Sequence, residues 1–278
     1  MENRIILITG STDGIGKQTA KKLAKSGATI LLHGRNATKG QSVKEEIIKS
    51  TGNTNIKFFK ADFSSLHEVR ALAEAIKSQY PYLNVLINNA GIFESSFKRS
   101  KDGLEMTFAV NHLAHFLLTC LLIDSLCAGA PARIINVASM AHSDTIDFDN
   151  LQGEKGYSGY TAYAYSKLEN ILFTFKLARL LDGTNITANC LHPGVINTKL
   201  LRAGWGIGGA STEQGAQAIV FLTESPQLKQ KSGKYFFDLQ GERQPTAMAY
   251  DEGVQERLWN ISEHLAGCSF GKLPKQCA

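Results

Sequence analysis

The sequence contains little that is typical of a secreted protein or of a protein that binds nucleic acid. Its five cysteines are odd in number and show no Cys-x-x-Cys spacing, so they predict free thiols in a reducing compartment rather than a disulfide framework or a zinc site. The net charge of +5 comes from scattered lysines and arginines, without the basic runs and interleaved aromatic residues of a nucleic-acid surface. The first residues, MENRIILITG, lead straight into a short apolar run and lack the layout of a signal peptide.

Long hydrophobic runs are also scarce. The most apolar one, LAHFLLTCLLIDSLC (113–127), is interrupted by His115 and Asp124 and is too short to span a bilayer comfortably, so it predicts a buried core helix. The sequence shows no internal repeat, low-complexity tract or interdomain linker. We therefore expect one domain over residues 1–278, no integral membrane segment and a cytoplasmic location.

Short apolar strand patterns alternate with longer helical patterns along almost the whole chain. RIILITG (4–10) and ATILLHG (28–34) are typical of strands, and each precedes a helical pattern, at 14–27 and at 39–50. Further strand candidates lie at 56–62, 84–91, 133–139, 185–194 and 233–239. Strands separated by helices form βαβ units, so the sequence predicts an α/β fold: a single-domain, Rossmann-type, doubly wound parallel sheet with helices on both faces.

Sheets of this kind bind ligands beyond the carboxyl ends of their strands. The first strand–helix junction, TGSTDGIG (9–16), places Gly10, Gly14 and Gly16 where small residues let the backbone approach a pyrophosphate at a helix N-terminus. A glycine-rich turn can also be no more than a tight connection. At the first junction of an α/β chain, however, it favours dinucleotide binding.

The end of the second strand, HGRN (33–36), bears on the choice of cofactor. No acid is present there for the ribose hydroxyls, while Arg35 is available for a 2′-phosphate and Lys17 adds positive charge, so the sequence favours NADP(H). Arg35 could instead be an ordinary solvated charge. Asp13 is a sign against NADP(H), because its carboxylate would repel the phosphate if it pointed inward.

Two later strand ends carry polar residues with two interpretations each. Asp62 could hydrogen-bond an adenine amine or cap the following helix. Asn89, in the NNAG segment (88–91), could contact the cofactor or belong to a structural hydrogen-bond network.

The stretch YSGYTAYAYSK (157–167) holds four tyrosines and one lysine. Tyr163 is four residues before Lys167, so on a helix the two share a face, whereas Tyr165 points elsewhere. A nearby positive charge favours the phenolate, so this spacing predicts a lowered pKa for Tyr163. Asn111, in an apolar helical run, and Ser139, at a strand end, are further candidates; His112 and His115 are expected to be packing or surface residues.

Together these residues resemble the short-chain dehydrogenase/reductase family. TGSTDGIG, NNAG, Asn111, Ser139, Tyr163-x3-Lys167 and HPG occur in the order and spacing of that family over nearly the full length. Finer features such as HGRN, VNHLAHF and HPGVINT are similar to the catalytic domain of the retinol dehydrogenase and WW-domain oxidoreductase branch.

The resemblance implies a catalytic set of Asn111, Ser139, Tyr163 and Lys167. Tyr163 would exchange a proton with the substrate oxygen, and Lys167 would lower its pKa and hold the nicotinamide ribose. Ser139 would hydrogen-bond the carbonyl oxygen, Asn111 would support a water-linked proton path, and no metal would be required. The residues expected to contact the cofactor are Gly10, Ser11, Asp13, Gly14, Ile15, Gly16, Arg35, Asn36, Asp62, Phe63, Asn89, Ala90, Gly91, Tyr163, Lys167, Pro193, Gly194, Val195 and Thr198.

The predicted function is an NADP(H)-dependent oxidoreductase that interconverts a small-molecule carbonyl and an alcohol. Apolar Ile92, Phe93 and Trp205 favour an apolar substrate, such as a retinal-like or xenobiotic carbonyl, and the glycine-rich loop at 195–211 is typical of a lid. One alternative is an NADP(H)-binding regulatory or scaffold protein with weak catalysis, which the complete catalytic set disfavours. Another is an epimerase or dehydratase, which the glycine spacing disfavours. The resemblance also allows a homo-oligomer.

Overall fold

The computed structural model describes residues 4–271 and residue 277. Within them, eight strands form one sheet in the order β3-β2-β1-β4-β5-β6-β7-β8. The strands are β1 (Ile5–Ile8), β2 (Thr29–Gly34), β3 (Ile56–Lys60), β4 (Val85–Asn88), β5 (Ala132–Val137), β6 (Ile186–His192), β7 (Tyr235–Phe237) and β8 (Glu242–Arg243). All neighbours are parallel except β7 and β8. The predicted doubly wound sheet is confirmed, with one antiparallel edge strand that the sequence pattern did not indicate.

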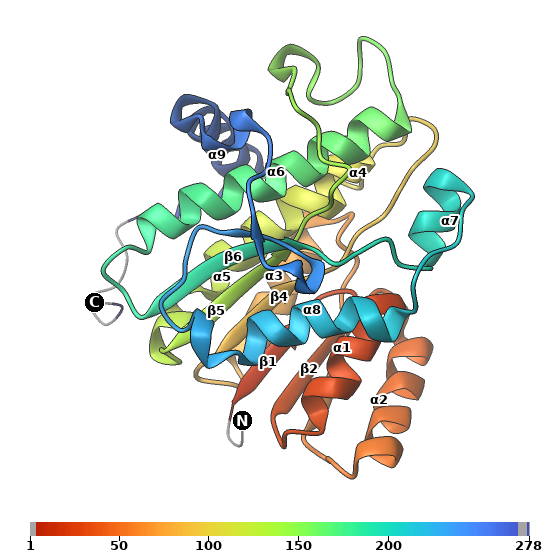
Figure 1. Cartoon of the computed structure of the whole chain (residues 1–278), viewed down its shortest axis with the longest axis vertical. Coiled ribbons are helices and arrows are strands. Elements are labelled where there is room, and N and C mark those ends of the chain that lie inside the picture. Colours follow the sequence, from red (N-terminus) through yellow and green to blue (C-terminus); the bar gives the residue numbers. More distant parts are fainter. Residues whose placement is uncertain (1–3, 272–276, 278) are drawn as a thin grey trace.

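Helices cover both faces of this sheet (Figure 1). The main helices are α1 (Gly14–Ala24), α2 (Ala37–Thr51), α3 (Leu66–Lys77), α4 (Met106–Phe108), α5 (Ala114–Ala128), α6 (Gly159–Leu180), α7 (Lys199–Trp205), α8 (Thr212–Glu224) and α9 (Glu252–Ala266). A π-helical turn, η1 (Ala109–Leu113), joins α4 to α5, and short 3-10 turns are η2 (Phe148–Asn150), η3 (Pro226–Leu228), η4 (Asp238–Gln240) and η5 (Ala247–Tyr250).

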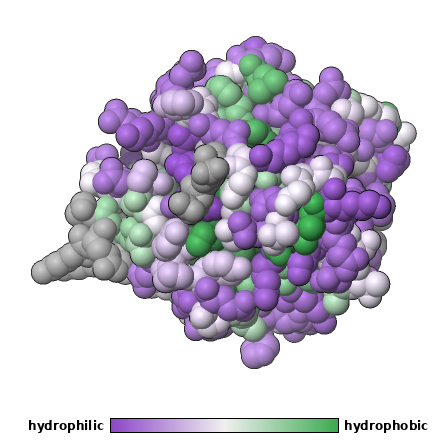
Figure 2. Space-filling view, turned by 90° about the horizontal axis from the view of Figure 1, so that it is seen from below, coloured by the Kyte–Doolittle hydropathy of each residue, from purple (hydrophilic) through white to green (hydrophobic). Residues whose placement is uncertain are grey.

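Alternation along the strands explains why both faces need a cover. In β1, Ile5 and Leu7 join one buried cluster with side chains of α3, α5, α6 and α9, while Ile6 and Ile8 join another with α1, α2 and α8. Because successive side chains of a strand point to opposite faces, an apolar strand buries both of its faces only when helices pack on each. The face of the molecule seen from below in Figure 1 is mostly hydrophilic, with hydrophobic residues in small separate patches (Figure 2).

The apolar run at 113–127 forms the core helix that the sequence predicts. The continuous helical stretch Met106–Ala128 is long and apolar enough to cross a membrane by length and composition. However, 89% of its most apolar 18-residue segment is buried inside the protein. Its residues contact α3, α6, α9 and the strands β4 and β5. The stretch is therefore the central helix of one layer of this fold.

The expectation of free thiols is wrong for four of the five cysteines. Cys120 forms a disulfide with Cys268, Cys127 forms one with Cys277, and Cys190 is free and buried. Cys120 and Cys127 lie two turns apart on one face of α5, where residues after α9 return to meet them. The partners are 148 and 150 residues apart in sequence, so only the tertiary fold reveals the pairing. The cytoplasmic location stays a prediction and loses the support of the cysteine argument.

Both disulfides can be tested by counting thiols. Without reductant, the unfolded oxidised protein should expose one alkylatable thiol, Cys190, and peptide mass spectrometry should find α5 peptides linked to peptides that contain Cys268 and Cys277. Reduction should lower stability by about 2–4 kcal/mol for each bridge, because the closed loops are long. Alkylation of all five cysteines in the unreduced protein would show that the bridges do not form.

Candidate active site

The order of the strands places the predicted site beyond the carboxyl ends of the central strands β1 and β4. The chain leaves β1 to form β2 and β3 on one side and returns to β4 on the other, so the direction of winding reverses between β1 and β4. In parallel sheets this point forms a crevice beyond the carboxyl ends of the strands. Apart from Tyr163 and Lys167 on α6, the predicted cofactor contacts follow such ends: Gly10 to Gly16 after β1, Arg35 and Asn36 after β2, Asp62 and Phe63 after β3, Asn89 to Gly91 after β4, and Pro193, Gly194, Val195 and Thr198 after β6.

The glycine loop is packed directly on the NNAG segment. Gly10 has a φ of +62°, and a Cβ there would lie 2.8 Å from Ala90 Cα. A larger residue would therefore suffer both backbone strain and a steric clash with Ala90. Asn89 Nδ2 donates to the carbonyl oxygen of Thr9 at 2.8 Å, and a Cβ on Gly16 would collide with that amide. Asn89 therefore braces the glycine loop, which is the structural network that the sequence left open, and its contact with a cofactor stays a prediction.

A buried histidine that the sequence analysis missed holds the loop from the other side. His33 Nδ1 accepts from the Gly10 amide at 3.2 Å, which leaves Nε2–H to donate to the Ala61 carbonyl oxygen at 3.1 Å. Burial lowers the pKa of His33 to about 4, so the ring is neutral at physiological pH. Its ring stacks on Phe63 with centroids 4.2 Å apart, which explains why Phe63 is buried.

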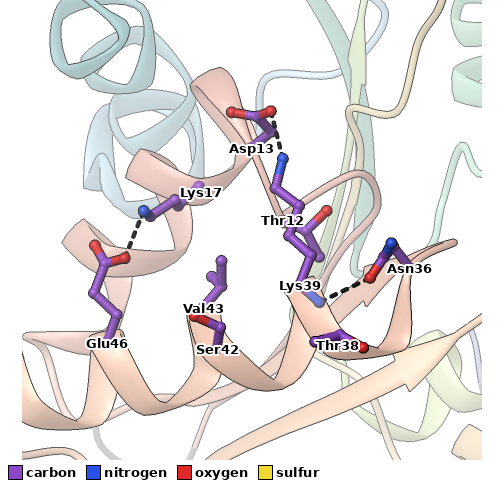
Figure 3. Close-up of a pocket in the computed structure, with 9 residues that line it drawn as sticks. All are labelled: Thr12, Asp13, Lys17, Asn36, Thr38, Lys39, Ser42, Val43 and Glu46. Atoms are coloured by element: carbon purple, nitrogen blue, oxygen red, sulfur yellow. Dashed lines mark hydrogen bonds and ion pairs between the residues drawn. The ribbon is translucent and has the colours of Figure 1, made fainter.

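An open cleft of about 530 Å³ lies between the glycine loop and α2 (Figure 3). It is lined by Thr12, Asp13, Lys17, Asn36, Thr38, Lys39, Ser42, Val43 and Glu46. Lys17 pairs with Glu46 at 2.6 Å and Lys39 with Asp13 at 2.5 Å inside the cleft, while Arg35 is exposed and lies outside the lining residues. Lys39 had not been singled out in the sequence, although it follows Asn36, the N-cap of α2, by three residues.

Asp13 does not leave a free negative charge in this cleft. It caps α1 by accepting from the Gly14 amide at 2.8 Å and pairs with Lys39 at 2.5 Å and Lys199 at 3.0 Å. Burial opposes ionisation of Asp13, but the hydrogen bonds from Lys39 and Lys199 outweigh it and hold its pKa well below the usual range. The objection that Asp13 raised to a phosphate is weakened, because two lysines already neutralise its charge.

Asp62 and Ser11, two further predicted cofactor contacts, have local hydrogen-bond partners in the structure. Ser65, not Asp62, caps α3, while Asp62 accepts from the Ser64 amide at 3.0 Å and pairs with Lys101 at 3.3 Å. Ser11 uses its hydroxyl to accept from the His33 amide at 2.9 Å, so its side chain ties β1 to β2. An adenine contact by Asp62 stays a prediction.

The four predicted catalytic residues come together from η1, the end of β5 and α6. Lys167 Nζ lies 5.4 Å from the centre of the Tyr163 ring and donates to the Val137 carbonyl oxygen at 3.1 Å. Ser139 hydrogen-bonds the Tyr163 side chain. Asn111 Oδ1 accepts from the Ile92 amide at 2.8 Å and Nδ2 donates to the Ile92 carbonyl oxygen at 3.0 Å, which holds the chain just beyond the NNAG segment.

The pKa of Tyr163 moves in the opposite direction from the expectation. Burial raises it to about 12, and the smaller effect of the Ser139 hydrogen bond works against that rise. Tyr163 is only 6% exposed, and Lys167 is itself so buried that its pKa falls to about 8. Desolvation of the phenolate therefore outweighs the attraction of the lysine in this structure.

Two aromatic rings pack against Tyr163. The Trp205 ring lies 5.3 Å from the Tyr163 ring and Phe93 lies 6.1 Å from it, centre to centre. Tyr160 packs on both Phe93 and Trp205, and its hydroxyl donates to the Gly204 carbonyl oxygen. The expected lid loop is thus partly a short helix, α7, capped by Thr198, and the bridge between Ile196 and Ala210 closes its base.

Comparison with known proteins decides the family. The short chain dehydrogenase family matches residues 4–205. Retinol dehydrogenase 12 of Mus musculus is 41% identical over 277 aligned residues, which cover 96% of this chain and 87% of the mouse protein. Retinol dehydrogenase 11 of Homo sapiens is 40% identical with the same two coverages, 96% and 87%. The protein belongs to the short-chain dehydrogenase family.

Solved structures agree with this assignment. A protein from Mycobacterium paratuberculosis matches the short-chain dehydrogenase fold of this chain with a TM-score of 0.80 at 30% identity, over 97% of this chain and 95% of the other. A short chain dehydrogenase of Escherichia coli CFT073, solved with NADPH, has a TM-score of 0.72 at 26% identity, over 86% of this chain and 98% of the other. As a member of the retinol dehydrogenase branch, this short-chain dehydrogenase is an oxidoreductase that acts on carbonyl and alcohol groups.

The buried histidines of this short-chain dehydrogenase predict a loss of stability in mild acid. Burial lowers the pKa of His33 and His192 to about 4, and that of His112 and His115 to about 3. The unfolded chain binds these protons near pH 6.5, so stability is fully present above that pH and falls as the pH drops toward the folded pKa values, by up to about 1.4 kcal/mol per pH unit for each histidine.

Urea unfolding at a series of pH values between 7 and 5 measures this dependence. The free energy of unfolding should fall steadily as the pH is lowered across the range. In His112→Phe its slope against pH should be smaller, by the amount that corresponds to uptake of about one proton on unfolding. A free energy that stays constant between pH 7 and pH 5 would contradict the neutral, buried state of these histidines.

Proposed function

We propose that this protein is an NADP(H)-dependent reductase of apolar aldehydes or ketones, working in reverse as an alcohol dehydrogenase. The observation that carries the proposal is the convergence of Tyr163, Ser139, Lys167 and Asn111 at the carboxyl ends of the strands, next to the glycine loop. The Escherichia coli and Shigella flexneri short chain dehydrogenases of known structure, with bound NADPH and NADP respectively, support the choice of cofactor.

The residues present fit a dinucleotide. Gly10 and Gly16 carry no side chain to stand between the loop backbone and a ligand, and the N-terminus of α1 favours a pyrophosphate beside it. Lys39 and Lys17 line the adjoining cleft, where a 2′-phosphate would compete with Asp13 and Glu46 for these two cations. Lys167 would hold the nicotinamide ribose. When bound, NADPH supplies the hydride that reduces the carbonyl carbon.

The chain supplies the proton for the same reduction. Because burial raises the pKa of Tyr163 to about 12, its hydroxyl is protonated at neutral pH and can donate to the carbonyl oxygen as the carbon receives the hydride. Ser139, hydrogen-bonded to Tyr163, orients that oxygen. Lys167 lies 5.4 Å from the ring and stabilises the phenolate that remains, until a proton from solvent restores the hydroxyl. The products are the alcohol and the oxidised cofactor.

The aromatic cover favours an apolar substrate. Phe93 and Trp205 pack on the Tyr163 ring and Tyr160 packs on both of them, so a carbonyl compound that reaches the Tyr163 hydroxyl would lie near these rings. Contacts of this kind favour apolar over charged carbonyl compounds. The retinol dehydrogenases to which the chain is similar make retinal a natural member of the first substrate panel.

Replacement of the proton donor tests the mechanism. In Tyr163→Phe, NADPH-dependent reduction should fall about 10²- to 10⁴-fold, because the general acid is lost, while NADPH binding is retained. The assay is NADPH consumption against aldehydes and ketones that range from small aromatic carbonyls to retinal. Tyr165→Phe, two residues along α6, is the matched control and should keep native turnover. NADPH binding without turnover of any carbonyl by the native protein would favour a regulatory or scaffold role.

Selectivity for NADPH over NADH should depend on Lys39 more than on Arg35. Lys39→Ala should raise the Kd for NADPH about tenfold and leave that for NADH nearly unchanged, because it removes a cation beside the 2′-phosphate. Arg35→Ala removes the same charge from outside the cleft and should have a smaller effect. If Arg35→Ala weakens NADPH binding and Lys39→Ala does not, the sequence-based assignment of Arg35 is the correct one.

A further inference from the structure

One buried histidine near the active site has no part in the mechanism above. His115 lies one turn beyond Asn111, at the start of α5, and is 1% exposed. The sequence suggested a packing or surface role for it. Both of its ring nitrogens nevertheless make hydrogen bonds, and the partners belong to opposite sides of the proposed active site.

The chemistry of the partners fixes the direction of each hydrogen bond. The main-chain oxygen of Asn111 can only accept, so His115 Nδ1–H donates to it at 3.0 Å. In the neutral ring Nε2 is then an acceptor, and the hydroxyl of Thr9 donates to it at 2.9 Å. Burial lowers the pKa of His115 to about 3, which keeps the ring in this neutral form.

The Thr9 hydroxyl uses all of its hydrogen-bonding capacity in linking His115 to the NNAG segment. Its hydroxyl oxygen accepts from the Asn89 amide at 2.8 Å and from the Ala90 amide at 2.9 Å. A hydroxyl has one proton and two lone pairs, so with the proton directed to His115 its capacity is filled. The 3.4 Å separation from the Ile87 carbonyl oxygen is the longer of the two options for that proton.

Together these hydrogen bonds fix the NNAG segment at both of its ends. Thr9 holds the amides of Asn89 and Ala90, and the side chain of Asn111 holds both backbone groups of Ile92. His115 joins the two anchors, because it bonds the Thr9 hydroxyl and the Asn111 carbonyl oxygen. Gly91, between the anchors, faces both Asn111 Oδ1 and Lys167 Nζ, so a shift of this segment would change the space beside two catalytic side chains.

We propose that His115 is a positioning residue that sets the catalytic Asn111 in register with the glycine loop and the NNAG segment. Its kinetic consequence rests on the proposed reductase function. The imidazole acts through Thr9 and Asn111 and does not touch the substrate. A small displacement of reacting groups is enough to lower the rate of the chemical step strongly.

Variants of His115 and Thr9 test this role. His115→Phe and Thr9→Val should each lower kcat about ten- to hundredfold, with the KM for the carbonyl substrate changed less than about threefold, because geometry and not substrate binding is disturbed. Thr9→Ser keeps the hydroxyl and should retain most of the native kcat. The double variant His115→Phe/Thr9→Val should be little worse than either single one, since both break the same connection.

His112→Phe is the matched control. His112 is an equally buried histidine three residues earlier, but its Nε2 pairs with the Ser262 hydroxyl at 2.8 Å, on the side facing α9. This variant should lose stability and keep the native kcat. Equal losses of kcat in His112→Phe and His115→Phe, or a native kcat in both His115→Phe and Thr9→Val, would overturn the positioning role.

A second measurement does not depend on turnover. Hydrogen exchange of the Asn89 and Ala90 amides should be faster in His115→Phe than in the native protein, and unchanged in His112→Phe. If the native protein reduces no carbonyl compound, the proposed function fails by itself. Unchanged exchange in His115→Phe would then show separately that His115 does not hold the NNAG segment.

Discussion

The active site depends on how the protein satisfies backbone groups at the point where the sheet reverses its winding. Beyond the ends of β1 and β4 the regular pairing of the two strands stops after the Thr9 amide, which still donates to the Ile87 carbonyl oxygen. Buried backbone groups beyond that point must find other hydrogen bonds. Side chains provide them: Asn89 bonds the Thr9 carbonyl oxygen, and the Thr9 hydroxyl accepts from the Asn89 and Ala90 amides. The same contacts hold the glycine loop to which we assign the pyrophosphate of the proposed cofactor.

The chemistry follows from burial as much as from charge. Tyr163 and Lys167 share a face of α6, as their spacing requires, yet desolvation raises the pKa of the tyrosine to about 12 and lowers that of the lysine to about 8. Both shifts favour the uncharged forms. In the proposed mechanism this protonated tyrosine, packed against Phe93 and Trp205, donates its proton to an apolar carbonyl compound.

Hydrophobicity patterns and residue spacing along the chain predicted the strands, the helices and the pairing of residues within one helix. Strands buried on both faces must be apolar and must alternate with helices, so the doubly wound sheet could be predicted from runs such as RIILITG and ATILLHG. Tyr163 and Lys167 could be paired because four residues span about one helical turn. The resemblance to a family added Asn111 and Ser139, and the structure brings all four residues to one place.

The remaining features depend on contacts between distant segments. Cys120 and Cys268 meet only because the chain after α9 returns to α5, and Lys39 rather than Arg35 faces the cleft because of how α2 packs beside α1. His115 was expected to be a packing or surface residue, since Thr9, the partner that links it to the glycine loop, is 106 residues away in the sequence. The pKa of Tyr163 could not be predicted because the extent of its burial depends on where α7 lies.

The most direct test of the central claim is the fate of hydrogen isotope during turnover. With NADPH that carries two deuterium atoms at C4 of the nicotinamide, and an apolar aldehyde or ketone in ordinary water, mass spectrometry of the alcohol should find one deuterium on the carbon that was the carbonyl carbon. Repeated with unlabelled NADPH in deuterated water, that carbon should carry no deuterium. An alcohol without deuterium in the first experiment, or with carbon-bound deuterium in the second, would contradict hydride transfer from NADPH.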